Sequence, residues 1–167
     1  MVGFYEGVGR ELTLFIQQVA WLNAKPDQIT AKGKKSGEIT RLNRLKAEKL
    51  EPDLPPNPMP HLTGWLFEIG PTGSNGMGPV PLSWQEIAAW EHLTGNELDA
   101  WEAKTLRALS AEFVSKMNEA KDPAMPAPYA SPEAIARNRD AVGRQITHGF
   151  SALKLAKSRS RVGGRKA

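Results

Sequence analysis

Apolar residues recur every three to four positions in several stretches of this chain, which is the periodicity of helices with one buried face. The first stretch covers residues 8–23, and Pro26 lies just beyond it, where it helps to end the helix. A second stretch covers residues 38–50 with a narrower apolar seam, and a third covers residues 61–69 and ends at Gly70. The apolar stripe of the first helix consists of Val8, Leu12, Phe15, Ile16, Val19 and Leu22.

A capping box predicts the start of a fourth helix. Ser83 is followed three positions later by Glu86. In this arrangement the serine oxygen accepts a hydrogen bond from the backbone N–H three residues on, and the glutamate reaches back to the backbone N–H of the cap. We expect the helix to run to Thr94 and to end at Gly95, because glycine adopts the left-handed conformation of a helix end at little cost.

A second box, of the aspartate kind, predicts a fifth helix. Asp99 and Glu102 stand at the same spacing, and the helix should continue to about Lys121. Because few residues separate Gly95 from Asp99, the fourth and fifth helices should form an αα-hairpin or corner. The expected buried stripe of the fifth helix consists of Ala103, Leu106, Leu109 (or Ser110), Phe113 and Met117.

Two proline clusters divide the chain, since proline fixes φ and removes a backbone donor. The pattern predicts an all-α protein: a small helical body containing an αα-hairpin, with basic helical N- and C-terminal arms joined by proline-rich linkers. No stretch indicates a strand, and residues 32–37 and 72–81 are expected to be loops. The expected parts are an N-terminal helical arm (1–51), a proline-rich linker (52–60), a helical core (61–122), a second proline-rich linker (123–130), a C-terminal basic amphipathic helix (131–157) and a disordered basic tail (158–167).

Charge is distributed unevenly along the 167 residues. The net charge of +4 combines +4 in residues 1–50, −7 in residues 51–130 and +7 in residues 131–167. Such polarity suits basic arms around an acidic body, or solvated helix faces. The chain has no cysteine and no run of about 20 apolar residues, so we expect no disulfide and no membrane span. The N-terminus does not resemble a signal peptide, and we expect a protein of the bacterial host cytoplasm.

Side chains with catalytic potential are scattered. His61, His92 and His148 belong to three separate predicted elements, without metal-ligand spacing. The glycine-rich stretch 73–78 lacks the lysine and the preceding strand of a phosphate-binding loop. Among the acidic residues, Glu86, Asp99 and Glu102 have capping roles, whereas Glu91 and Glu97 should face solvent. We therefore expect no enzyme activity, no cofactor and no metal.

Four tryptophans lie in or just before the predicted hairpin: Trp65, Trp84, Trp90 and Trp101. Two interpretations fit them: core packing, or contact with a partner, since tryptophan is favoured at binding hot spots. A small helical core has few places for four indoles whose N–H groups need acceptors.

The ordered string of residues 76–109 resembles the tail assembly chaperones of long-tailed phages and prophages. It contains Gly-Met-Gly-Pro-Val-Pro-Leu-Ser-Trp, then Glu-Ile-Ala-Ala-Trp-Glu-His-Leu-Thr-Gly, then Trp-Glu-Ala-Lys-Thr-Leu-Arg-Ala-Leu. The resemblance covers residues 52–114, with a proline-rich lead-in and an apolar aromatic helix. It implies a factor that binds the tape measure protein and keeps it soluble until the tail tube polymerises, with the tail tube protein as a second candidate partner.

The contact residues expected under this hypothesis are mainly aromatic or apolar: Trp65, Phe67, Met77, Pro79, Trp84, Trp90 and Trp101. Candidate electrostatic contacts lie on the polar face of the C-terminal helix: Arg137, Arg139, Arg144, Lys154 and Lys157. The alternative is a basic adaptor or structural phage protein that binds nucleic acid or a virion component through this arm. Its binding would depend strongly on salt, whereas an apolar groove would be nearly insensitive.

Overall fold

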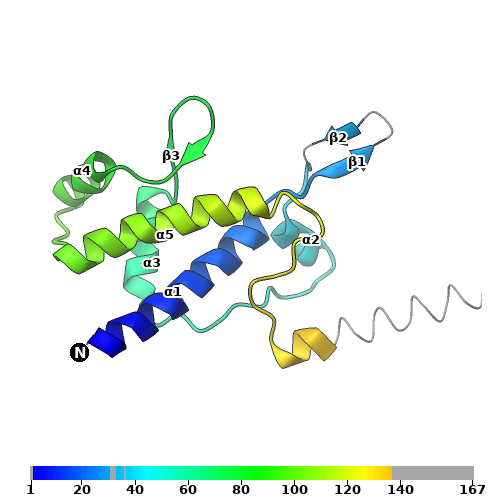
Figure 1. Ribbon diagram of the computed structural model, residues 1–167, viewed down its shortest axis with the longest axis horizontal. Coiled ribbons are helices and arrows are strands. Elements are labelled where there is room, and N and C mark those ends of the chain that lie inside the picture. Colours follow the sequence, from blue (N-terminus) through cyan, green and yellow to red (C-terminus); the bar gives the residue numbers. More distant parts are fainter. Residues whose placement is uncertain (1, 31–32, 36, 137–167) are drawn as a thin grey trace, which may run out of the picture. The chain divides into compact units, whose positions relative to one another are not determined.

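The chain consists of two units, Met1–Tyr129 and Ala130–Ala167, and the computed structural model describes residues 2–30, 33–35 and 37–136 (Figure 1). It is mostly helical, as expected. The elements of the first unit are α1 (Val2–Asn23), β1 (Gln28–Thr30), β2 (Gly33–Lys35), α2 (Arg41–Ala47), α3 (Pro60–Ile69), β3 (Gly73–Ser74), β4 (Pro79–Val80), α4 (Trp84–Thr94) and α5 (Ala100–Glu119).

The hydrophobic core forms where α1, α3 and α5 meet, and α1 packs along α5 (Figure 1). α1 is therefore part of the central body and not a separate N-terminal arm. The reason is that its apolar stripe needs a partner, which the long stripe of α5 supplies; each fully buried leucine or isoleucine contributes about 1.5 to 3 kcal/mol. The buried members of the core are Leu12, Ile16, Ala20, Leu62, Leu66, Leu82, Ile87, Leu106, Leu109 and Phe113.

Arg41 joins the ends of α1 and α5. Its guanidinium donates to the carbonyl oxygen of Ala120 (2.6 Å) and to that of Asp122 (3.0 Å), and it lies 4.5 Å from the centre of the Trp21 ring. A weaker contact of 3.4 Å reaches the Trp21 carbonyl oxygen. Burial, aided by the nearby Arg44, lowers the pKa of the Arg41 guanidinium, and Asp122 opposes this shift. Arginine nevertheless stays charged, so one cation compensates the partial negative charge of carbonyls at two helix ends.

Both predicted capping boxes are confirmed. The Ser83 hydroxyl accepts from the Glu86 backbone N–H, and the Glu86 carboxylate accepts from the Ser83 N–H at 2.7 Å. Asp99 and Glu102 form the equivalent pair at the start of α5. α4 ends at Gly95 with φ 69°, the left-handed conformation that glycine permits.

Two short antiparallel hairpins correct the expectation of a strand-free chain. β1 pairs with β2, and β3 pairs with β4 in the segment expected to be a loop. Each strand has only two or three residues, too few for the alternating pattern that marks strands in a sequence. The second expected helix, over residues 38–50, is also shorter than predicted, since α2 begins after its cap Thr40 and ends at Ala47.

Ser110 attaches the β3–β4 segment to α5. Its hydroxyl donates to the Pro71 carbonyl oxygen and accepts from the Leu82 backbone N–H, both at 2.8 Å, and the side chain is fully buried. Because these two partners lie on either side of the hairpin, one hydroxyl fixes both of its ends. This contact positions the start of α4, which follows directly.

The first proline-rich segment lies against α1 and acts as a strap. The buried Gln18 side chain donates to the Asp53 carbonyl oxygen (2.8 Å) and accepts from the Tyr129 backbone N–H (3.0 Å). Pro55 is buried as well, and Pro60 provides the first residue of α3. One amide thus holds two extended segments from distant parts of the chain.

Of the second unit, residues 130–136 are described. Ser131 caps a helical turn at the start of the expected C-terminal helix, since its hydroxyl accepts from the Ala134 backbone N–H at 3.2 Å. The remainder of the expected C-terminal helix and the expected disordered tail lie outside the described residues. So do the five candidate electrostatic residues, Arg137, Arg139, Arg144, Lys154 and Lys157.

Candidate functional site

The seven expected contact residues fall into an exposed group and a more deeply buried group. Phe67, Met77, Pro79 and Trp84 are exposed; the exposed fraction is 40% for Phe67, 95% for Met77 and 49% for Trp84. Phe67 extends from α3, and its ring lies 6.2 Å from that of the buried Phe113. Met77 lies at the tip of the β3–β4 hairpin. These side chains remain available to a partner.

The other three tryptophans lie deeper. Trp90 is only 8% exposed, and its ring lies 5.9 Å from that of Trp65, which is partly buried against the core. Trp90 therefore offers little surface to a partner, because its side of α4 faces the interior together with Ile87. Trp101 is partly buried and packs against the core as well, but one side of it borders a groove.

This groove, with a volume of about 670 Å³, runs between the middle of α1 and the N-terminal half of α5. Such a volume falls in the range of binding sites. From α5 it is bordered by Trp101, Lys104, Thr105, Ala108 and Leu109, and from α1 by Gly9, Arg10, Thr13, Leu14 and Gln17. The sequence does not identify these α1 residues as groove residues. The periodicity of α1 shows that one of its faces is buried, but not which helix packs beside that face.

A second hollow of about 290 Å³ adjoins the groove on the α4 side of α5. Lys104 and Ala108 border both cavities, so the two hollows lie on either side of the same ridge of α5. The second is lined by Pro81, Trp84, Lys104, Arg107, Ala108 and Ala111. We call the two hollows together the α1–α5 groove, after the first of them; no described residue of α1 lines the second. Trp101 borders the first hollow and Trp84 the second, so the two tryptophans lie on opposite sides of this ridge, an arrangement that the sequence alone could not show.

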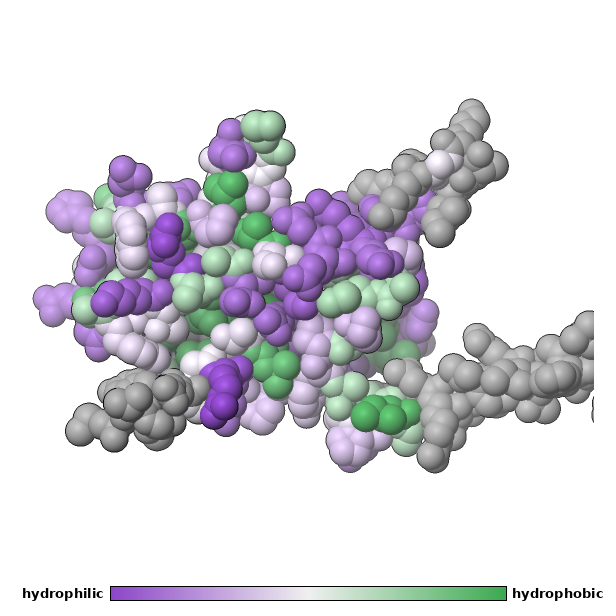
Figure 2. Space-filling view, in the orientation of Figure 1, coloured by the Kyte–Doolittle hydropathy of each residue, from purple (hydrophilic) through white to green (hydrophobic). Residues whose placement is uncertain are grey.

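The α1–α5 groove combines apolar walls with a basic rim. Its charged lining residues are Arg10, Lys104 and Arg107, and none of the lining residues that the structure describes is acidic. The neighbouring carboxylate of Glu112 accepts a hydrogen bond of 2.8 Å from Gln17, at the α1 side of the groove. Apolar residues also reach the surface elsewhere among hydrophilic ones (Figure 2).

The guanidinium of Arg107 holds the exposed tryptophan in place. Its central carbon lies 5.2 Å from the centre of the Trp84 ring, within the distance of a cation–π contact. Arg107 lies on α5 and Trp84 is the first residue of α4, so this contact fixes an indole at the groove wall. A tryptophan ordered before binding loses little side-chain entropy when a partner covers it.

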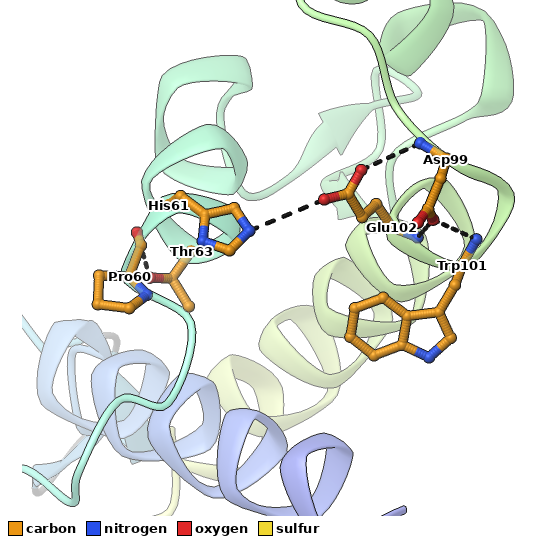
Figure 3. A network of polar contacts seen from close by, with 6 residues as sticks. All are labelled: Pro60, His61, Thr63, Asp99, Trp101 and Glu102. Atoms are coloured by element: carbon orange, nitrogen blue, oxygen red, sulfur yellow. Dashed lines mark hydrogen bonds and ion pairs between the residues drawn. The ribbon is translucent and has the colours of Figure 1, made fainter. Parts of the chain in front are cut away.

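A polar network joins the start of α3 to the start of α5 (Figure 3). His61 Nε2 lies 3.8 Å from the Glu102 carboxylate, which also accepts from the Asp99 backbone N–H at 3.0 Å. The His61 ring packs edge-on against Trp65, with centroids 5.1 Å apart. Asp99 and Glu102 thus cap α5, and Glu102 also connects it to the start of α3.

Glu91 also has a structural partner, contrary to the expectation that it simply faces solvent. Its carboxylate accepts from the Leu98 backbone N–H at 2.9 Å, and so braces the connection between α4 and α5. Glu97 is exposed as expected. Within the described residues, no three histidine, aspartate or glutamate side chains gather as metal ligands would.

Comparisons of the chain with protein-family models, with characterised proteins and with solved structures give no significant match. In the described part of the chain, no helix combines the length and apolar character needed to cross a bilayer.

Proposed function

We propose that this protein is a tail assembly chaperone of a phage or prophage, which binds the tape measure protein and keeps it soluble until the tail tube polymerises around it. Binding takes place in the host cytoplasm and makes or breaks no covalent bond. The observation that carries the proposal is the α1–α5 groove, an apolar depression with the half-exposed Trp84 at its wall.

The physical need of such a client supports the proposal. A tape measure protein exposes long apolar helix faces before assembly, and exposed apolar faces associate with one another. A groove between helices can cover such a face by helix-in-groove contacts. Trp84, Trp101 and the tip residue Met77 all belong to the segment whose sequence resembles the chaperone family.

Co-expression tests the proposal. Fragments of the tape measure protein encoded in the same tail gene cluster are produced with and without this chain, and the soluble fraction is measured. We expect the chain to raise it at least severalfold, and Trp84→Ala to lose most of that gain while retaining the helical circular dichroism spectrum. Tryptophan anchors at interfaces typically account for about 2 kcal/mol or more of binding.

Ile39→Ser is the matched control, because Ile39 is an exposed apolar residue outside the resembling segment. It should leave solubilisation unchanged. If no tape measure fragment becomes more soluble, or if the Trp84 and Ile39 variants behave alike, the proposal is wrong.

The same assay separates the alternative of a basic adaptor that acts through residues 131–167. Binding that disappears between low and moderate salt, and that persists in Trp84→Ala, would support the adaptor. Binding that survives moderate salt and requires Trp84 supports the chaperone.

A further inference from the structure

We infer that the segment held in the α1–α5 groove is an amphipathic α-helix whose apolar face is flanked by carboxylates. The inference rests on the proposed function, since the helix would belong to the client protein. It assigns that client a chemistry that the family resemblance does not supply. It is argued from the shape of the groove and from the charges around it.

Shape favours a helix. α1 and α5 lie side by side (Figure 1). The first hollow is lined by residues spread over positions 9–17 of α1 and 101–109 of α5, so it follows both helices for about two turns. A third helix packs in such a depression by placing its side-chain ridges between those of the two walls. Gly9, Ala108 and Ala111 on the walls are small, which allows a helix to approach closely.

The cations around the groove indicate which kind of helix it binds. Arg10, Lys104 and Arg107 surround the apolar walls, and the described lining includes no carboxylate to neutralise them. Lys104 borders both hollows and therefore lies near the middle of any helix that covers them. Acidic side chains beside the apolar face of the incoming helix would meet these cations, whereas basic ones would be repelled.

Two other occupants fit less well. The chain's own residues 131–167 carry a net charge of +7, which disfavours their binding beside three cations. A second copy of the chain would require an acidic amphipathic helix on its own surface. The apolar faces of α1, α3 and α5 are instead buried in the common core.

The test uses the full chain and three labelled synthetic peptides of about 20 residues, long enough for five helical turns. The first has a leucine face flanked by glutamates, the second replaces every glutamate by lysine, and the third scrambles the first so that the face is lost. Fluorescence anisotropy should show the first peptide binding at least about tenfold more tightly than either control.

Charge reversal locates the site. Lys104→Glu should weaken the acidic peptide about tenfold or more and improve binding of the lysine peptide, an effect that misfolding cannot produce. Lys46→Glu on α2 is the matched control, because it changes net charge equally at an exposed position away from the groove. Equal affinity for acidic and basic peptides, or equal behaviour of the two variants, would overturn the inference.

The remaining outcomes are also decisive. Sedimentation that shows a dimer lost in Lys104→Glu would identify a second copy as the occupant and overturn the inference. Solubilisation of tape measure fragments without any preference for the acidic peptide would leave the chaperone function standing and reject the acidic helix. Acidic-peptide binding without solubilisation of any fragment would reject the tape measure as client and retain the chemistry of the groove.

Discussion

The Trp84 ring and the Arg107 guanidinium lie 5.2 Å apart, so an exposed aromatic on α4 is held by a cation on α5. The contact leaves half of the indole uncovered at the wall of the α1–α5 groove. Arg107→Ala should therefore free the ring and weaken client binding by up to about fivefold, with little loss of stability, because exposed cation–π contacts contribute about 0.5 to 1 kcal/mol. Trp84 emission and its accessibility to iodide, measured in a background with the other tryptophans replaced by phenylalanine, would check the change. An unchanged quenching rate would show that the arginine does not hold the ring.

Trp90 should respond to mutation in the opposite way. Its ring is buried, and in the described part of the chain no acceptor lies within hydrogen-bond distance of its Nε1. Trp90→Ala should cost about 3 to 5 kcal/mol of unfolding free energy through the cavity it leaves. Trp90→Phe should cost much less, because it removes the unpaired N–H along with part of the ring. Urea unfolding of the parent and of the two variants measures both changes in the free energy of unfolding. If Trp90→Phe costs as much as Trp90→Ala, the indole N–H has an acceptor.

Arg41 should be the most sensitive charged residue of the described body. Its guanidinium binds carbonyl oxygens at the ends of both α1 and α5. Arg41→Met should cost about 2 to 4 kcal/mol, because it leaves buried carbonyls without donors. Arg41→Lys should recover only part of the loss, since an ammonium cannot reproduce the planar fork. Chemical denaturation tests this order, and a lysine variant as stable as the parent would contradict it.

Loss of the Ser110 hydroxyl should lower the stability of the protein and loosen the attachment of the β3–β4 hairpin to α5. Ser110→Ala removes one donor and one acceptor and leaves the Leu82 N–H and the Pro71 carbonyl unsatisfied. We expect a loss of about 1 to 3 kcal/mol. Amide hydrogen exchange should become faster at Leu82 while the middle of α5 keeps its protection. Unchanged exchange at Leu82 would show that the hydroxyl is dispensable.

The capping box of α4 predicts a pH dependence. Hydrogen bonds from the Ser83 backbone N–H and hydroxyl lower the pKa of Glu86 below its ordinary value of 4.5. Because the folded pKa is the lower one, this contribution to stability is complete above pH 4.5 and is lost as the pH falls through the folded pKa. Glu86→Gln keeps a capping side chain that does not titrate. The melting temperature of the variant should therefore fall less than that of the parent between neutral pH and about pH 3. If both melting temperatures fall equally with pH, the Glu86 carboxylate does not contribute in this way.

The sequence predicts local structure better than it predicts contacts between helices. The residues that cap α4 and α5 are adjacent to the helices they start, so Ser83 and Asp99 could be recognised directly. The pairing of α1 with α5 could not, since an apolar stripe identifies a buried face without identifying its partner. The β3–β4 hairpin is held by Ser110, 28 positions beyond Leu82, and no local pattern predicts that contact.

At the candidate site, too, the sequence predicts local features but not the packing between helices. The sequence indicates that tryptophans are concentrated in one region, but Trp84 and Trp90 both lie three residues from the buried Ile87. Only packing decides that Trp90 turns inward while Trp84 stays half exposed. The contribution of α1 to the groove, through Arg10 and Leu14, likewise depends on a contact between segments more than 80 residues apart.

Site-specific photocrosslinking tests most directly whether a client lies in the α1–α5 groove. A benzophenone amino acid is placed at Ala108, on the ridge of α5 shared by both hollows, or at Ala89, an exposed position of α4 outside them. Each variant is then irradiated while co-expressed with a tape measure fragment. Our account predicts a crosslinked complex from position 108 and none from position 89. Crosslinking from position 89 alone, or from neither position while the fragment remains soluble, would contradict it.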